Sequence, residues 1–150
     1  MRLGVDFGGT KIEAALLDST GEILERQRVP NAGDYQAAVR AVAELTARIE
    51  QQTGARADTV GIAMPGSLSP LTGLVRNSNS VWLNGKPFFE DLKTALVRPV
   101  RVENDANCFV CASVISRRRP SAFRASLGTG WAESYTDNSL IGTGWNDCSR

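Results

Sequence analysis

Short apolar runs alternate with tight turns over the first thirty residues, and this arrangement constrains the fold more than any other feature of the chain. Residues 3–7 form an apolar run that ends in Gly8-Gly9, residues 12–17 form a second, and residues 22–29 follow a turn cluster at 18–21 as a third expected strand. Runs of this length bounded by Gly, Asp and Ser are typical of strands. The pattern predicts an antiparallel meander of three strands.

Helix and strand signals alternate along the next eighty residues. Apolar residues from 35 to 49 recur at helical spacing between Asp34, a candidate N-cap, and Gly54, a helix terminator. Residues 67–87 are rich in Gly, Pro, Asn and Ser, which predicts an irregular loop with a small hairpin, and a loop of that length is usually functional. Further elements are expected at 59–63 (strand), 88–97 (helix closed by Pro99), 100–102 (strand) and from 106 (helix). The predicted α/β order is therefore βββαβαβ plus a helix.

Composition excludes several classes of protein. The chain has 150 residues, enough for one domain, and a net charge of +1, which provides no electrostatic argument for nucleic acid or a membrane surface. No apolar run approaches the roughly 20 residues that span a bilayer, and the start lacks a signal-peptide core, so a cytoplasmic protein is expected. Three cysteines do not make a disulfide framework. The absence of histidine excludes a Ser-His-Asp triad and an imidazole base within this chain.

One candidate site is the turn between the first two predicted strands. Two glycines allow successive backbone N–H groups to approach an anion, and the following threonine and lysine add a hydroxyl donor and a positive charge. An aspartate at the end of the first strand is suited to hold magnesium through water. An ordinary Gly-Gly hairpin turn explains the same residues equally well. The segment reads Asp6, Phe7, Gly8, Gly9, Thr10, Lys11.

A second candidate is the segment from Glu103 to Asn107, placed between the last predicted strand and a helix. Asp105 is suited to accept a proton from a substrate hydroxyl in phosphoryl transfer, and the neighbouring amides are suited to hydrogen bond with sugar hydroxyls. Taken alone, the segment is explained better as a helix cap. The third candidate is the loop from Pro65 to Gly85, whose Asn and Trp residues suit a carbohydrate but also suit an ordinary surface loop.

Together these segments resemble, in order and spacing, the N-terminal domain of ROK-family sugar kinases. The resemblance rests on residues 6–11, on Met64-Pro65-Gly66 and on residues 104–107, and it covers residues 1–109. The loops 66–73 and 77–85 resemble the fructokinase branch. The alternatives are an N-acetylglucosamine or glucose kinase of the same family and a non-catalytic sugar-binding remnant. The family's repressors carry a DNA-binding element ahead of the Gly-Gly motif, so the kinase branch, without nucleic-acid partners, is expected.

The resemblance implies a ribonuclease-H-like fold of the actin/hexokinase ATPase type, one of two domains around a cleft. It implies ATP and magnesium as cofactors, a hexose substrate phosphorylated at O6, and a homodimer. Asp105 would be the general base, and Asp6 would lie near magnesium. ATP would contact Gly4, Asp6, Gly8, Gly9, Thr10 and Lys11, with a second phosphate turn at Gly128, Thr129 and Gly130; the sugar would contact Gly66, Asn79, Asn104 and Asp105.

The resemblance weakens toward the C-terminus. We expect residues 1–115 to form the sugar-kinase domain and residues 116–150 to form a divergent, poorly packed tail. Net charge changes from −1 over residues 1–109 to +2 over 110–150, and Arg117-Arg118-Arg119 interrupts the expected helix. The family's His-containing zinc segment is absent, so no zinc site is predicted. A truncated or frame-shifted reading frame with little activity is the resulting hypothesis.

Overall fold

A computed structural model describes residues 1–108 of the chain. The expected phosphate turn at Gly128, Thr129 and Gly130 and the expected tail lie outside the described residues, as does most of the helix predicted after Asp105.

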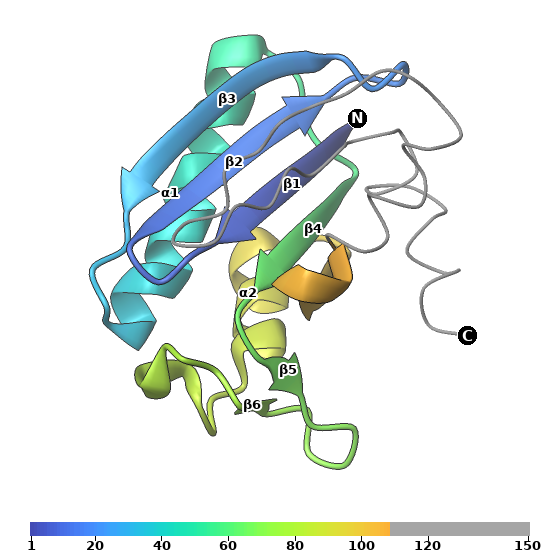
Figure 1. Cartoon of the computed structure of the whole chain (residues 1–150). Helices are drawn as coiled ribbons and strands as arrows, with labels where there is room; N and C mark the ends of the chain where they lie inside the picture. The colour runs from blue at the N-terminus through green and yellow to red at the C-terminus, as the bar shows by residue number, and fades with distance from the viewer. Residues whose placement is uncertain (109–150) are drawn as a thin grey trace.

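The centre of the fold is a five-stranded mixed sheet with strand order β3-β2-β1-β4-β7 (Figure 1). β1 (Arg2–Phe7), β2 (Lys11–Leu17) and β3 (Ile23–Pro30) form the predicted antiparallel meander. β4 (Thr59–Met64) pairs parallel with β1, and β7 (Val100–Asn104) pairs parallel with β4. The carboxyl ends of β1, β4 and β7 therefore lie at one edge of the sheet.

Two helices, α1 (Tyr35–Thr53) and α2 (Phe88–Leu96), cover one face of the sheet (Figure 1). The start of α1 is set as predicted, since the Asp34 side chain accepts a hydrogen bond from the Ala37 N–H, 2.8 Å away. Gly54 ends the helix in the left-handed conformation, φ 65°. Helix α2 ends one residue earlier than predicted, because Val97 adopts φ 52° and leaves the helix before Pro99.

Alternate residues of β1 point into the core between the sheet and the helices. Leu3, Val5 and Phe7 are buried, and the Phe7 ring meets the ring of Phe88 edge-on at 4.8 Å between centroids. The intervening residues of β1, including Gly4 and Asp6, lie on the opposite face and are half-buried. That alternation places Asp6 away from the apolar core, on the face that neither α1 nor α2 covers.

The expected loop at 67–87 contains the small hairpin that was predicted. Its strands are β5 (Ser67–Leu68) and β6 (Val75–Arg76), and a single 3₁₀ turn, Val81–Leu83, follows. Trp82 is partly buried against the core, as an ordinary surface loop would place it. The last predicted strand is longer than expected and runs to Asn104, with residues 105–108 in the first turn of a helix. Neither described helix has the length and apolarity needed to cross a bilayer.

Candidate functional site

Three segments meet at the carboxyl edge of the parallel strands. The turn after β1 carries Gly8 to Lys11, the segment after β4 carries Gly66, and the end of β7 carries Asn104, followed by Asp105. Ligands of open α/β sheets bind at this edge, because loops from neighbouring parallel strands converge there. The sheet topology thus brings together candidates that are up to a hundred residues apart in the sequence.

The backbone of the turn after β1 is arranged as an anion site requires. The Gly8 N–H donates to the Lys11 carbonyl at 2.9 Å and closes the turn. A side chain at position 8 would place its Cβ 2.9 Å from that same carbonyl oxygen, so only glycine fits. Gly9 and Thr10 are exposed, and their N–H groups have no hydrogen-bond partner within residues 1–108. Two adjacent donors are therefore available to a phosphate.

Asn31 shapes this turn, and sequence reasoning missed it. Its side-chain Nδ2 donates to the Gly8 carbonyl at 2.8 Å, and its backbone N–H donates to the Thr10 carbonyl at 2.9 Å. These partners are more than twenty residues away in sequence and meet Asn31 only because β2 pairs with β3. In the sequence, Asn31 belongs to an ordinary turn cluster, Pro30 to Gly33, which contains no signal of this role.

Asp6 lies on the same sheet face as Glu13 and beside Lys11 and Asp105. Burial raises the pKa of its carboxyl to about 6, the negative charges of Glu13 and Asp105 add to the rise, and Lys11 opposes it. Its register partner Glu13 also forms an ion pair with Arg26. A carboxylate held so close to other negative charges is stabilised by a cation or by a proton.

The donor set around Asp6 fits magnesium that arrives with phosphates. Within residues 1–108 no three His, Cys, Asp or Glu side chains gather closely enough to hold a metal by themselves. Magnesium is commonly bound by one or two carboxylates together with substrate phosphates and water. Asp6, one residue before Phe7 and the anion turn, can supply the carboxylate of such a shared site.

Asn104 joins the second and third segments. Its side-chain Nδ2 donates to the Gly66 carbonyl at 2.6 Å, and its Oδ1 accepts from the Ala106 N–H at 2.9 Å. Asp105 Oδ1 also accepts from the Ala106 N–H, at 2.8 Å. The helix-cap interpretation is therefore confirmed for Asn104, whereas Asp105 is the first residue of the helix and, among the described residues, accepts a hydrogen bond only from the N–H of the next residue. It does not exclude the catalytic one, because the second carboxylate oxygen of Asp105 has no hydrogen-bond partner within residues 1–108.

Gly66 cannot be replaced by a larger residue without moving the backbone. It has φ 91°, and a Cβ there would lie 2.7 Å from the Arg76 carbonyl oxygen and 2.9 Å from the Ser78 N and Cα. Its carbonyl is already occupied by Asn104. Gly66 therefore acts here through its shape and holds the loop after β4 against the segment that carries Ser78.

Asn79 is exposed between two buried serines, Ser78 and Ser80. The Asn84 side chain holds this segment by two hydrogen bonds: its Oδ1 accepts from the Ser78 N–H at 2.9 Å, and its Nδ2 donates to the Ser78 carbonyl at 3.0 Å. The Asn79 side chain has no partner among the described residues and is available to a ligand. Asn84 was part of the predicted Asn-rich loop, but the sequence did not reveal this bracing role.

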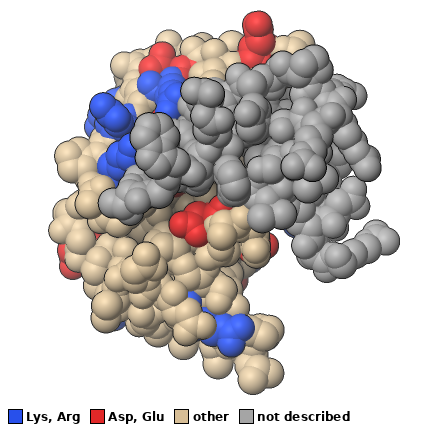
Figure 2. Space-filling model, in the orientation of Figure 1, with Lys and Arg blue, Asp and Glu red and all other residues tan. Residues whose placement is uncertain are grey.

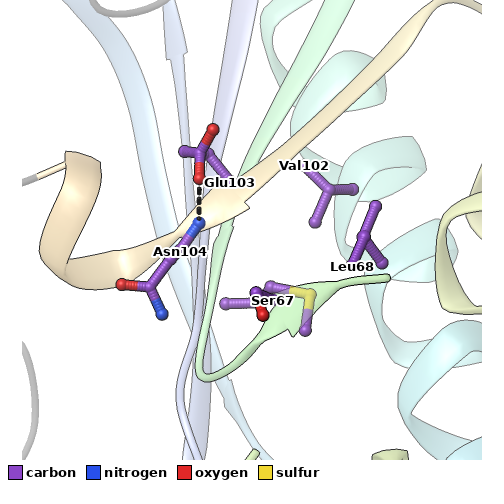
Figure 3. A pocket seen from close by; sticks show the side chains of 6 residues that line it. Ser67, Leu68, Val102, Glu103 and Asn104 are labelled. Atoms are coloured by element: carbon purple, nitrogen blue, oxygen red, sulfur yellow. Dashed lines mark hydrogen bonds between the residues drawn. The ribbon is translucent and has the colours of Figure 1, made fainter. Parts of the chain in front are cut away.

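A surface hollow of about 180 Å³ lies beside Asn104. Figure 3 shows its lining from the ends of β4 and β7 and from β5, with Glu103, whose carboxylate accepts from the Asn104 N–H at 2.9 Å. The hollow is smaller than the roughly 300–1,000 Å³ of complete small-molecule sites. Its lining is Met64, Ser67, Leu68, Val102, Glu103 and Asn104.

Gly4 lies within β1, not in the turn that follows it. It sits between Ala15 of β2 and Gly61 of β4, so that three small residues adjoin on the open sheet face.

Figure 2 shows basic side chains gathered over β2 and β3 and acidic ones near the carboxyl end of β4. The remaining predicted residues within 1–108 gather at the carboxyl edge.

The chain is similar to sugar kinases along nearly its whole length. It is 34% identical over 148 residues to an N-acetyl-D-glucosamine kinase of Haemophilus influenzae, covering 96% of this chain and 48% of that protein. It is 38% identical over 142 residues to the enzyme of the same name from Shigella boydii, covering 94% and 41%. The chain thus spans about half the length of the curated relatives that it matches.

Solved structures show the same architecture. A ROK hexokinase from Thermus thermophilus superposes with a TM-score of 0.64 and 33% identity, over 75% of this chain and 37% of that one. A ROK glucokinase from Streptomyces griseus, solved with glucose and AMPPNP, superposes with a TM-score of 0.66 and 28% identity, over 75% and 35%. The expected hexokinase-type ATPase fold is confirmed.

These relatives carry the names N-acetyl-D-glucosamine kinase, hexokinase and glucokinase, so they do not specifically support the expected fructokinase branch. A sequence model of the ROK family matches residues 2–145. That match spans more than half of the chain, which therefore belongs to the ROK family.

Proposed function

We propose that this chain supplies the hexose-binding and phosphate-binding half of an ATP-dependent sugar kinase. The convergence of the Gly8–Lys11 turn, Gly66 and Asp105 at one sheet edge carries the proposal. Phosphoryl transfer depends mainly on positioning and on charge stabilisation, and this edge offers an anion turn beside a carboxylate that can accept a proton.

Asp105 acts as the general base on the sugar 6-hydroxyl. Oδ1 is held by the Ala106 N–H, which orients the carboxylate and leaves the other oxygen for the hydroxyl proton. Asn104 is fixed by Gly66 and keeps the adjacent backbone in place. Asn104, Asn79 and Gly66 would line the sugar subsite, with the hollow beside Asn104 accepting part of the ring.

The Gly9 and Thr10 N–H groups, with Lys11, receive the ATP phosphates. Magnesium, when bound, neutralises charge on those phosphates, and Asp6 would hold it together with water. The raised pKa of Asp6 supports this role: burial, with the negative charges of Glu13 and Asp105, disfavours its charged form, and a bound cation would stabilise that form.

N-acetylglucosamine is the sugar that we propose first, with glucose next. Relatives that are 34–38% identical carry the former name, and a structural neighbour was solved with glucose. The loops 66–73 and 77–85 resemble the fructokinase branch instead, so fructose is the competing substrate to be tested beside them.

The test is formation of sugar phosphate by the full chain. Mass spectrometry would detect product from magnesium-ATP with N-acetylglucosamine, glucose or fructose, and calorimetry would measure sugar binding. We expect binding of N-acetylglucosamine or glucose and its 6-phosphorylation at a low rate, because the chain spans about half the length of its curated relatives. Preferential phosphorylation of fructose would overturn the choice of sugar, and neither binding nor product with any hexose would overturn the proposed function.

Asp105→Asn tests the base. The amide preserves size and the contact with the Ala106 N–H but cannot accept the hydroxyl proton, so product formation should fall at least about 100-fold, the lower range for a general base, while sugar affinity changes little. The matched control is Glu44→Gln, which removes an exposed carboxylate on α1 and should leave both quantities unchanged. Turnover that survives in Asp105→Asn would contradict the assignment.

A further inference from the structure

In the turn after β1, most carbonyl groups accept hydrogen bonds, whereas two adjacent N–H groups donate none to another described residue. Three of its four carbonyls accept hydrogen bonds: Gly8 from the Asn31 side chain, Thr10 from the Asn31 N–H and Lys11 from the Gly8 N–H. The Gly9 carbonyl accepts none within residues 1–108. The N–H groups of Gly9 and Thr10 are left without partners within residues 1–108. An anion is repelled by carbonyl oxygens and attracted by N–H groups. The two N–H groups without partners are therefore what an anion site needs.

We infer that Asn31 is a positioning residue for the phosphate-binding turn, an inference that rests on the proposed function. The backbone bond from Asn31 to Thr10 extends the pairing of β3 with β2 and survives any side-chain change. The bond from Nδ2 to the Gly8 carbonyl is made by the side chain alone. It holds that carbonyl, and with it the peptide plane that carries the Gly9 N–H.

The Asn31 side chain is also held at its amide oxygen. The Gly33 N–H donates to Asn31 Oδ1 at 3.2 Å, so both ends of the amide are engaged and its donor end faces Gly8. If the amide were flipped, its oxygen would face the Gly8 carbonyl and its NH₂ group would face the Gly33 N–H, and both contacts would be repulsive. The two contacts therefore agree on one orientation, and the side chain braces the turn without touching the phosphate.

The consequence is a selective effect on phosphate binding. Without the brace, the Gly8–Gly9 peptide can rotate and its N–H need no longer face the anion, so part of the binding free energy is spent on reordering the turn. Loss of one neutral hydrogen bond corresponds to about a fivefold change in affinity, or about 1 kcal/mol. Sugar binding depends on Gly66, Asn79 and Asn104 and should not change.

The experiment titrates the full, ¹⁵N-labelled chain with sodium tripolyphosphate at constant ionic strength. In the unaltered chain the Gly9 and Thr10 amide resonances should shift in a saturable way. In Asn31→Ala the dissociation constant for tripolyphosphate should rise about fivefold, while the dissociation constant for the sugar stays the same. Equal tripolyphosphate affinity in the unaltered chain and in Asn31→Ala would overturn the role of Asn31.

Two further measurements separate the possible causes of failure. If the unaltered chain shows no shift at Gly9 and Thr10, the phosphate site of the proposed function is wrong, whereas a shift that Asn31→Ala does not weaken refutes only the brace. Asn31→Asp keeps the size of the side chain and the acceptor for Gly33 but loses the donor to Gly8, so it should weaken tripolyphosphate at least as much as alanine does. Should Asn31→Ala fail to fold, undiminished affinity in Asn31→Asp would overturn the inference.

Discussion

Substitution of Gly66 by alanine should destabilise the protein and loosen the link between the β4 and β7 segments. A side chain at φ 91° is strained, at a cost of about 1–2 kcal/mol for an L-residue in left-handed space. The added Cβ would also lie within 2.9 Å of three atoms, all of them backbone, of Arg76 and Ser78. Backbone atoms cannot swing aside as a flexible side chain can, so a further cost of about 1–3 kcal/mol is expected.

The sum, roughly 2–5 kcal/mol, is a large part of the roughly 5–15 kcal/mol that typically stabilises a folded domain. Gly73 provides a matched control, because it has φ 71° and a Cβ there would meet nothing within 4 Å. Gly73→Ala should therefore cost only the conformational part, about 1–2 kcal/mol. The difference between the two variants isolates the close approach of the Gly66 loop to Arg76 and Ser78.

Urea unfolding followed by far-ultraviolet circular dichroism measures both variants on the same scale. We expect the Gly66→Ala midpoint to lie well below that of Gly73→Ala, and its sugar affinity to fall because the Gly66 carbonyl moves away from Asn104. Equal losses of unfolding free energy in the two variants would refute the steric argument. Unchanged sugar affinity in a folded Gly66→Ala would refute the link to the site.

The other predictions concern charge. Asp6→Asn should raise the free energy of unfolding by about 3 kcal/mol at pH 7 and by little at pH 4. The folded pKa of Asp6 is raised from 3.8 to about 6, so the native state binds more protons than the unfolded chain and loses stability as pH rises through that window. Urea titrations at both pH values test this, and an equal effect at both would contradict it. Arg98→Ala should cost about 1–3 kcal/mol, because Arg98 bonds to the Ala57 carbonyl at 2.9 Å and pairs with the largely buried Glu50 carboxylate. Burial raises the pKa of Glu50, but the hydrogen bonds from Arg98 and the Ala57 N–H lower it overall. This stabilisation is therefore present above pH 4.5 and is lost on acidification. If the free energies of unfolding of the unaltered chain and Arg98→Ala differ by the same amount at pH 6 and pH 3, the pairing is contradicted.

The strands and helices were largely predictable because their signals are local. The meander follows from apolar runs separated by turns, and the start of α1 follows from Asp34, whose side chain caps the helix as the spacing predicts. The end of α2 was predicted one residue too late, because Val97 adopts a left-handed conformation that its residue type does not announce. The residue at which a helix ends is predicted less precisely from local sequence than the helix itself.

The candidate site was only partly predictable. Residues 6–11 and 104–105 stood out as segments, yet each had an equally good or better explanation as a turn or a cap until their order and spacing were considered together. The roles of Asn31, Asn84 and Glu103 were not predicted, because these roles depend on hydrogen bonds that only the folded chain forms. Nothing in their own sequence neighbourhoods distinguishes them from ordinary loop and strand-end residues.

The sequence by itself determined which segments form strands and helices, since apolar period, glycine turns and capping side chains act over a few residues. Only the tertiary structure decided that the turn after β1, Gly66 and Asp105 share one edge, because parallel pairing of β1, β4 and β7 aligns their carboxyl ends. It also decided that Asn104 serves both as a helix cap and as a link to Gly66, 38 residues away. Because Asn104 has partners in two segments, its function depends on where the sheet places it.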